Sequence, residues 1–263
     1  MGDILKGKAA IVTGAGRGIG RGIAVELARE GAQVVVASRS QGSIDRTVKE
    51  ITDEGNVAVG ALCDVGDHDH IKRTVAEAVE RFGRLDILVN NAQSFGAREA
   101  PAPNPVLTPL EDFNDGEWER TFETGPTATY RFMKAAFPHL KASGAGRVIN
   151  MGSHWGQIGY AGSAAYNAAK EAIRGLTRTG AREWGQYGIT VNVINPTIAS
   201  DALIYFRAHN PEASSRTLEN IPMRRYGDIY ADGGRIAVFL AGPDSAYLTG
   251  MTFQVDGGLF LHP

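Results

Sequence analysis

The feature of this sequence that most limits its fold is a regular alternation of short apolar runs with longer amphipathic stretches. The apolar runs have the length of single strands, and the amphipathic stretches have the length and apolar spacing of helices. Strands that alternate with helices pair in parallel, and the helices then cover both faces of the sheet. The expected strands are 9–13, 33–38, 57–62, 85–90, 146–151, 189–195 and 251–255.

The amphipathic stretches between these strands predict the helical layers. No repeat or low-complexity linker divides the 263 residues, and the proline-rich segment 100–109 is interpreted as a surface loop because the alternation resumes after it. We therefore expect one α/β domain over residues 1–263, a doubly wound parallel sheet of about seven strands with no separate substrate domain. The expected helices are 18–30, 43–54, 67–82, 116–142, 163–184 and 228–241.

Composition excludes several classes of protein. The 27 basic and 29 acidic residues give a net charge of -2, so no basic surplus indicates a nucleic-acid or anionic membrane partner. No apolar run approaches the roughly 18 residues of a membrane span, and a cytoplasmic location is expected. The single cysteine, Cys63, excludes an internal disulfide and is expected in the core.

An acidic and histidine-rich run at residues 67–70 resembles a metal-binding cluster at first sight. Adjacent residues at the start of a helix point in different directions, however, and Asp67 stands where a helix cap is expected. We therefore predict a capped helix start and no metal site.

A glycine-rich segment stands where the first expected strand passes into the first expected helix. Its glycines follow the spacing Gly-x-x-x-Gly-x-Gly in residues 14–20. Glycine lets a phosphate approach the backbone, and a helix N-terminus offers free N–H groups and the positive end of the helix dipole. We predict cofactor phosphate binding here, with a purely structural turn as the alternative. The residues assigned to it are Thr13, Gly14, Arg17, Gly18, Ile19 and Gly20.

The end of the second expected strand carries the next cofactor signal, Ser38, Arg39 and Ser40. In dinucleotide-binding folds an acidic residue here binds the ribose 2′-hydroxyl, whereas an arginine accommodates a 2′-phosphate. Arg17 should lie close to Arg39 in such a fold. We therefore predict NADP(H) as the cofactor. The alternative, that both arginines are merely solvated, is weakened because no carboxylate follows before Asp45.

A serine, a tyrosine and a lysine form the candidate reaction centre. Ser153 directly follows an expected strand, and Tyr166 and Lys170 are four residues apart in an alanine-rich helix, so their side chains share one face. A tyrosine has an ordinary pKa of about 10, and a nearby cation favours the phenolate. The same spacing occurs in Tyr130 and Lys134, which no strand-end serine precedes, and we interpret those two as a packed aromatic beside a solvated lysine.

Taken together, these motifs resemble the short-chain dehydrogenase/reductase family over nearly the whole chain. The resemblance implies a Rossmann-like fold and the NADP(H)-dependent interconversion of a ketone and a secondary alcohol, hence a small-molecule carbonyl or alcohol substrate. It also implies a homo-oligomer, a tetramer or dimer built through helices 116–142 and 163–184. The matching segments are 13–20, Asp64, 90–92, Ser153, Tyr166 with Lys170, 192–196 and 249–258.

The resemblance further implies a role for each matching residue. Ser153 would hold the substrate oxygen and Tyr166 would give or take its proton. Lys170 would bind the nicotinamide ribose and lower the tyrosine pKa, while Asp64 would bind the adenine amino group. The other cofactor-binding positions implied are Val65 beside the adenine, Asn90 and Ala92 on the adenosine side, and Pro196 and Ile198.

The chain departs from the family pattern at three positions. Gly125 stands where the family usually has an asparagine whose backbone holds a water linking the lysine to solvent, and Pro126 predicts a break or kink there. Gln93 and Thr197 replace usual glycines. They either narrow or polarise the pocket, or the backbone adjusts locally and specificity is unchanged. These departures motivate an alternative function, a catalytically silent NADP(H)-binding sensor or scaffold.

Substrate contacts are expected from loop residues near the reaction centre. Several are aromatic, which favours a ring-bearing or otherwise apolar ketone, although the same side chains could serve only packing. The candidates are Gln93, Ser94, His154, Trp155, Tyr160 and Tyr205.

Overall fold

A seven-stranded parallel sheet forms the centre of the molecule, with strand order β3-β2-β1-β4-β7-β8-β9. The computed structural model describes residues 3–102, 104–209 and 211–260. The predicted doubly wound sheet is therefore confirmed, with strand boundaries shifted by one or two residues. The strands are β1 (Ala9–Thr13), β2 (Gln33–Ser38), β3 (Ala58–Leu62), β4 (Ile87–Asn90), β7 (Arg147–Met151), β8 (Thr190–Pro196) and β9 (Thr252–Val255).

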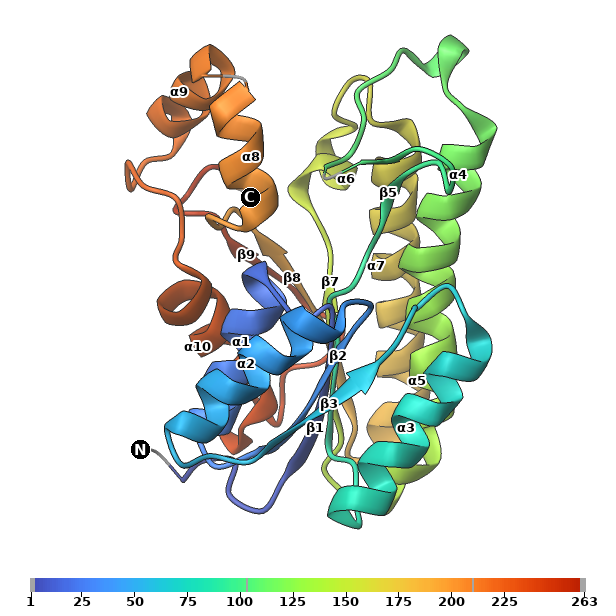
Figure 1. Cartoon of the computed structure of the whole chain (residues 1–263), viewed down its shortest axis with the longest axis vertical. Coiled ribbons are helices and arrows are strands. Elements are labelled where there is room, and N and C mark those ends of the chain that lie inside the picture. The colour runs from blue at the N-terminus through green and yellow to red at the C-terminus, as the bar shows by residue number, and fades with distance from the viewer. Residues whose placement is uncertain (1–2, 103, 210, 261–263) are drawn as a thin grey trace.

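Helices cover both faces of the sheet (Figure 1). One layer contains α1 (Gly18–Arg29), α2 (Gln41–Asp53) and α10 (Arg235–Ala241), and the other contains α3 (His68–Phe82), α5 (Ala128–Ala142) and α7 (Ala164–Trp184). Because side chains alternate across a strand, Ala10 and Val12 of β1 enter the core under the first layer and Ile11 enters the other. This double burial explains why the strands are almost uniformly apolar.

The predicted helix 116–142 is divided in the structure. It consists of α4 (Asp115–Phe122), the π-helix η2 (Glu123–Thr127) and α5. At Gly125 and Pro126, where a break or kink was predicted, the regular α-helical pattern gives way to this π-helix, in which the backbone stays helical and the Ala128 N–H donates to the Glu123 carbonyl, five residues back. A longer hydrogen-bonded turn accommodates a proline that has no N–H to donate.

Further elements were not predicted from the sequence. Residues 100–109 do not form a loop throughout, because β6 (Pro101–Ala102) pairs with β5 (Phe95–Gly96). The predicted helix 228–241 begins with a π-helix, η4 (Ile229–Gly234). The remaining elements are α6 (His154–Ile158), α8 (Asp201–His209), α9 (Pro211–Asn220), and the 3-10 helices η1 (Leu110–Asp112), η3 (Gly185–Tyr187) and η5 (Pro243–Ser245).

Several smaller expectations can be compared with the structure. The Asp67 carboxylate caps α3 by accepting from the Asp69 and His70 N–H groups, and the described residues contain no group able to hold a metal ion. Cys63 is buried, as predicted. The expectation of a packed Tyr130 was wrong, because 49% of this residue is exposed. Among the described helices none is long and apolar enough to span a bilayer.

Candidate active site

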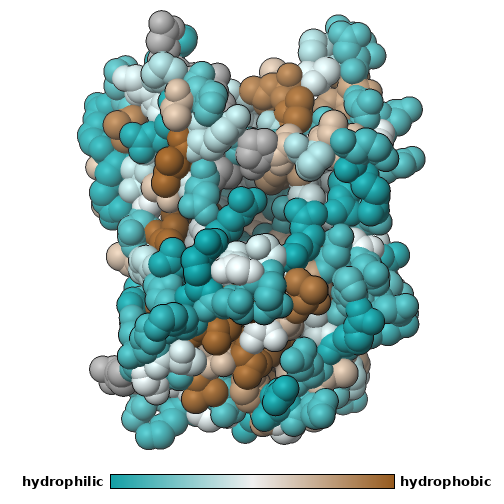
Figure 2. Space-filling model, in the orientation of Figure 1, coloured by the Kyte–Doolittle hydropathy of each residue, from teal (hydrophilic) through white to brown (hydrophobic). Residues whose placement is uncertain are grey.

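A large cavity opens at the carboxyl ends of the central strands, between α8 and α9 on one side and α6 on the other. Its volume is about 1140 Å³. Figure 2 shows a hollow in the upper half of the molecule, between the part that contains α8 and α9 and the part that contains α6. β1 and β4 are neighbours in the sheet, but the chain leaves them toward opposite edges, so the cavity lies at the switch point where doubly wound folds bind ligands.

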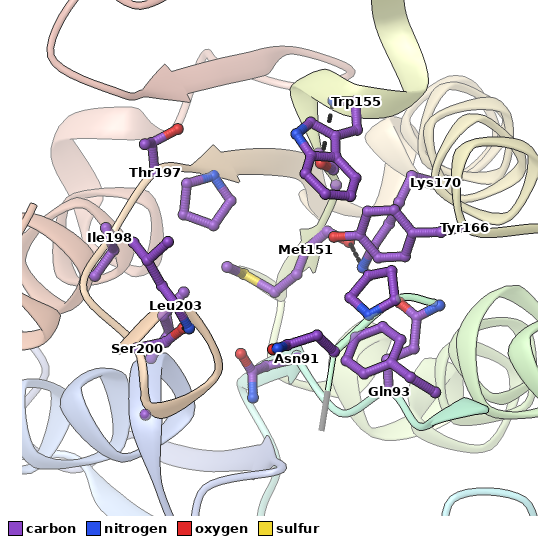
Figure 3. Close-up of a pocket in the computed structure, with 18 of the residues that line it drawn as sticks. Asn91, Gln93, Met151, Trp155, Tyr166, Lys170, Thr197, Ile198, Ser200 and Leu203 are labelled. Carbon is purple, nitrogen blue, oxygen red and sulfur yellow. Dashed lines mark hydrogen bonds between the residues drawn. The ribbon is translucent and has the colours of Figure 1, made fainter. Parts of the chain in front are cut away.

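Ser153, Tyr166 and Lys170 all line this cavity, and Figure 3 shows Tyr166 and Lys170 side by side on one wall. Ser153 is buried at the end of β7, and its Oγ caps α6 by accepting from the Trp155 N–H at 3.2 Å. Lys170 Nζ lies 5.3 Å from the centre of the Tyr166 ring and donates to the Met151 carbonyl at 2.9 Å. The lysine is thus fixed behind the phenol, one helical turn along α7.

Burial shifts the pKa values of Tyr166 and Lys170 when no cofactor is bound. Desolvation raises the pKa of Tyr166, although the Ser153 hydroxyl acts in the lowering direction. Desolvation also lowers the pKa of Lys170 to about 7. Burial therefore sets the direction of the shift at Tyr166, and the lowering of the tyrosine pKa by Lys170 stays a prediction.

The buried lysine predicts a pH-dependent stability. Its folded pKa of about 7 lies below the ordinary 10.5, so between these values the unfolded chain binds more protons and the free energy of unfolding rises with pH. From pH 7.5 to 8.5 we expect the free energy of unfolding of the wild type to rise by about 1 kcal/mol more than that of Lys170→Met. Urea unfolding of both proteins at the two pH values measures this difference. The same change in the free energy of unfolding for both proteins would contradict it.

The glycine turn offers free backbone donors to the cavity. Gly14 and Gly18 have positive φ values of 66° and 55°, and α1 begins without a side-chain cap. The turn is held in shape by Asn91, whose Nδ2 donates to the Thr13 carbonyl at 2.8 Å. A Cβ atom added at Gly14 would lie 2.8 Å from that Nδ2. An uncapped helix start beside a close-packed glycine turn fits a phosphate group.

Two arginines lie in the cavity wall together with this candidate phosphate site. Arg17 and Arg39 are exposed and line the cavity together with Ser38. Within the described part of the chain neither guanidinium has a carboxylate partner in an ion pair, whereas many other arginines do. Two unneutralised guanidinium groups beside the end of β2 fit the 2′-phosphate of NADP(H).

Most of the predicted cofactor residues line the cavity, but five lie outside its lining. Thr13 Oγ1 accepts from the Asn91 and Ala92 N–H groups, so it joins β1 to the segment after β4. The Asn90 side chain donates to Asn150 in the core. The lining residues are Gly14, Arg17, Gly18, Ile19, Ser38, Arg39, Val65, Ala92, Tyr166, Lys170, Pro196 and Ile198, and the others are Thr13, Gly20, Ser40, Asp64 and Asn90.

Aromatic rings form a continuous wall beside the reaction centre. Trp155 stacks on Tyr160 with ring centres 4.1 Å apart and an interplanar angle of 7°. Tyr166 is packed edge-on between Trp155 at 6.0 Å and Phe95 at 5.8 Å. All six predicted substrate residues line the cavity: Gln93, Ser94, His154, Trp155, Tyr160 and Tyr205.

Sequence reasoning missed several residues of the cavity wall. Asn91 stands between two predicted cofactor residues, so its position in the sequence was the available signal. Met151 ends β7, two residues before Ser153, and this position was also a signal. Others belong to α8 or to segments without a regular apolar pattern, where only the fold reveals their position. The missed residues include Asn91, Leu107, Met151, Leu203, Tyr226 and Phe260.

The fold and this cavity wall define a dinucleotide-binding α/β protein. Comparison with known proteins then identifies the family. A family model described as Enoyl-(Acyl carrier protein) reductase matches residues 14–260. The chain therefore belongs to the short-chain dehydrogenase/reductase family of oxidoreductases, as its motifs predicted.

Individual relatives match this chain along nearly their full length. The chain is 37% identical to a 12alpha-hydroxysteroid dehydrogenase from Clostridium sp., over 99% of each chain. It is 36% identical to a 3-oxoacyl-(acyl-carrier-protein) reductase from Vibrio harveyi, over 98% of this chain and 99% of that one. A solved structure of a candidate NAD(P)-dependent gluconate 5-dehydrogenase from Beutenbergia cavernae, with bound NADP, has a TM-score of 0.86 and 32% identity, covering 97% of each chain.

Proposed function

We propose that this protein is an NADP(H)-dependent oxidoreductase that interconverts a ketone and a secondary alcohol, with Tyr166 as the general acid and base. The observation that carries the proposal is one cavity whose wall runs from the uncapped start of α1 and its two arginines to the cluster of Ser153, Tyr166 and Lys170. The bound nicotinamide would supply or accept the hydride. NADP in a solved relative and the reductases among the relatives support this assignment.

In ketone reduction the chain's own residues manage the proton. The Ser153 and Tyr166 hydroxyls are placed to donate to a carbonyl oxygen, where negative charge develops in the transition state. Tyr166 then gives its proton to that oxygen and, in alcohol oxidation, takes it back. Lys170, held by the Met151 carbonyl, stabilises the phenolate that Tyr166 becomes. Ser153 and Lys170 are buried, which strengthens their electrostatic interactions.

The aromatic wall favours a ring-bearing or otherwise apolar ketone as substrate. Trp155 and Tyr160 present a flat apolar surface that a fused or single ring can cover. The hydroxysteroid dehydrogenase among the relatives supports this choice.

Trp155→Ala tests the substrate assignment. We expect kcat/KM for a ring-bearing ketone to fall about tenfold or more, since loss of a stacking ring costs on the order of 1 kcal/mol beyond the lost apolar area. Activity with a short linear ketone should change far less. Steady-state kinetics with both substrates measure the split, and equal losses for both would contradict a role in ring binding.

A catalytically silent NADP(H) sensor of the same fold is the alternative function. Gly125 and Gln93 favour it, since both depart from the family pattern beside the reaction centre. Steady-state NADPH oxidation with a panel of linear, cyclic and fused-ring ketones distinguishes the two. Turnover of one good substrate supports the enzyme, whereas tight NADPH binding without turnover of any carbonyl supports the sensor.

We also infer a homo-oligomer, a tetramer or dimer, working in the cytoplasm. The helices expected to form the contacts expose aromatic side chains, Trp118 at 41% and Tyr130 at 49%. Trp118 stacks on Phe122 at 4.9 Å, so this surface is preorganised. Light scattering coupled to size-exclusion chromatography would reveal the state, and a monomer at micromolar concentration would contradict it.

A further inference from the structure

The Gln93 side chain carries a buried carboxamide without protein partners. Both its Nε2 and its Oε1 are shielded from solvent and make no hydrogen bond to any described residue. Leaving such a group unsatisfied costs about 1–3 kcal/mol. A polar group held at this cost beside a reaction centre requires an explanation, because an apolar side chain of the same size would be more stable here.

Gly125 makes the room for this carboxamide. A Cβ atom added at Gly125 would lie 3.1 Å from Gln93 Nε2 and 3.4 Å from its Cδ, and 3.8 Å from the Cβ of Ala169. The carboxamide therefore lies against Gly125 of the π-helix η2, and Ala169 of α7, the residue that precedes Lys170, approaches the same glycine. Figure 3 shows Gln93 on the side of the cavity where Tyr166 and Lys170 lie.

Lys170 has unused hydrogen-bonding capacity on the same side of the cavity. Its ammonium has three N–H groups, and among the described residues it donates one hydrogen bond, to the Met151 carbonyl. A buried site that is roomy enough and offers two or more polar partners holds an ordered water. The Gln93 carboxamide and the Lys170 ammonium are such partners.

We propose that Gln93 is a positioning residue whose carboxamide, seated against Gly125, completes the hydrogen bonding of Lys170 through a bridging water. The inference rests on the proposed function, in which Lys170 supports Tyr166. It makes the two departures from the family pattern a matched pair, because a Cβ at 125 would crowd the Gln93 carboxamide. Through this link the ammonium is oriented and remains connected to a polar neighbour.

The first test is Gln93→Met, which keeps the volume and removes both polar atoms. We expect kcat for ketone reduction to fall about tenfold or more, while the NADPH dissociation constant and the ketone KM stay within about twofold. The melting temperature should be unchanged or higher, since an unsatisfied polar group has been removed. Full kcat in Gln93→Met, with wild type active and Tyr166→Phe inactive, would overturn this inference and leave the proposed function standing.

A double-mutant cycle tests the pairing with Gly125. In Gly125→Ala the added methyl group crowds the carboxamide, since it would lie 3.1 Å from Nε2, so kcat should fall. The loss in the double variant with Gln93→Ala should then be smaller than the sum of the two single losses. Because position 125 precedes a proline, Gly125→Ala has a backbone cost of its own. This cost is present with and without Gln93, so it cancels in the cycle. Gly175→Ala in α7, where an added Cβ has no neighbour within 4 Å, is the control and should leave kcat unchanged. Fully additive losses would overturn the pairing.

A second readout needs no turnover and remains decisive if no substrate is found. Lysine carbon-13 NMR of the cofactor-free protein reports the titration of Lys170. Loss of the carboxamide oxygen removes a group that favours the ammonium, so Gln93→Met should lower the titration midpoint. The neighbouring titratable groups are Tyr166 on α7, His154 on α6, and Glu123 in η2, which pairs with arginines; all are kept in the variant. An unchanged midpoint would overturn the link.

Discussion

Replacing Tyr166 with phenylalanine should lower kcat for ketone reduction by about 10²- to 10⁴-fold, the usual contribution of a positioned general acid. Phenylalanine keeps the ring that packs against Trp155 and Phe95, so the cavity wall stays intact and NADPH binding should change little. Only the proton that reaches the substrate oxygen is lost. Stopped-flow measurement of NADPH oxidation under single-turnover conditions records the effect.

The chain supplies a matched control for this variant. Tyr130 is followed by Lys134 at the same spacing, with the ammonium 5.9 Å from the ring centre, but Tyr130 does not line the cavity. Tyr130→Phe should therefore keep wild-type kcat. A Tyr166→Phe protein with full activity would show that the phenol transfers no proton and that the proposed mechanism is wrong.

Arg39→Asp should move the cofactor preference from NADPH toward NADH. A charge-assisted pair with the 2′-phosphate is replaced by repulsion, while the new carboxylate can accept a hydrogen bond from a free 2′-hydroxyl. Together these changes should lower the NADPH-to-NADH ratio of kcat/KM by about 10²-fold or more, since each charged hydrogen bond contributes about 1.5–3 kcal/mol. Initial rates with both cofactors and one ketone give the ratio.

Arg46→Asp separates the local effect of Arg39 from a general change in net charge. Arg46 is exposed on α2 and does not line the cavity, so its replacement should leave the ratio within about twofold. An unchanged ratio in Arg39→Asp would remove Arg39 from the cofactor site, and with it the main support for NADP(H) over NAD(H).

The fold could be predicted because local and global signals agree in this chain. Every residue of β1 is buried, so the strand is an unbroken apolar run that no solvent-exposed face interrupts. The glycine turn and the strand-end Ser153 then stand at the carboxyl edge of the sheet as a direct consequence of parallel pairing. Proximity of Tyr166 and Lys170 follows from helical spacing alone.

What could not be predicted depends on tertiary surroundings. Pro126 indicated a break or kink, but the form that it takes, a π-helix that packs against α7, could not be predicted. Burial of the phenol raises the pKa of Tyr166, and helical spacing does not report burial. α9 has a polar composition with few apolar anchors, so its place beside the cavity becomes visible only in the fold.

The transfer of hydrogen from cofactor to substrate tests the central claim most directly. A ring-bearing ketone is incubated with the protein and NADPH that carries deuterium at C4 of the nicotinamide, using each of the two C4 positions in turn, and the alcohol is examined by mass spectrometry and NMR. We predict deuterium on the carbinol carbon from one labelled position and none from the other. Bound NADPH that yields no alcohol from any ketone of the panel, or an alcohol that carries no label from either position, would contradict the proposed function.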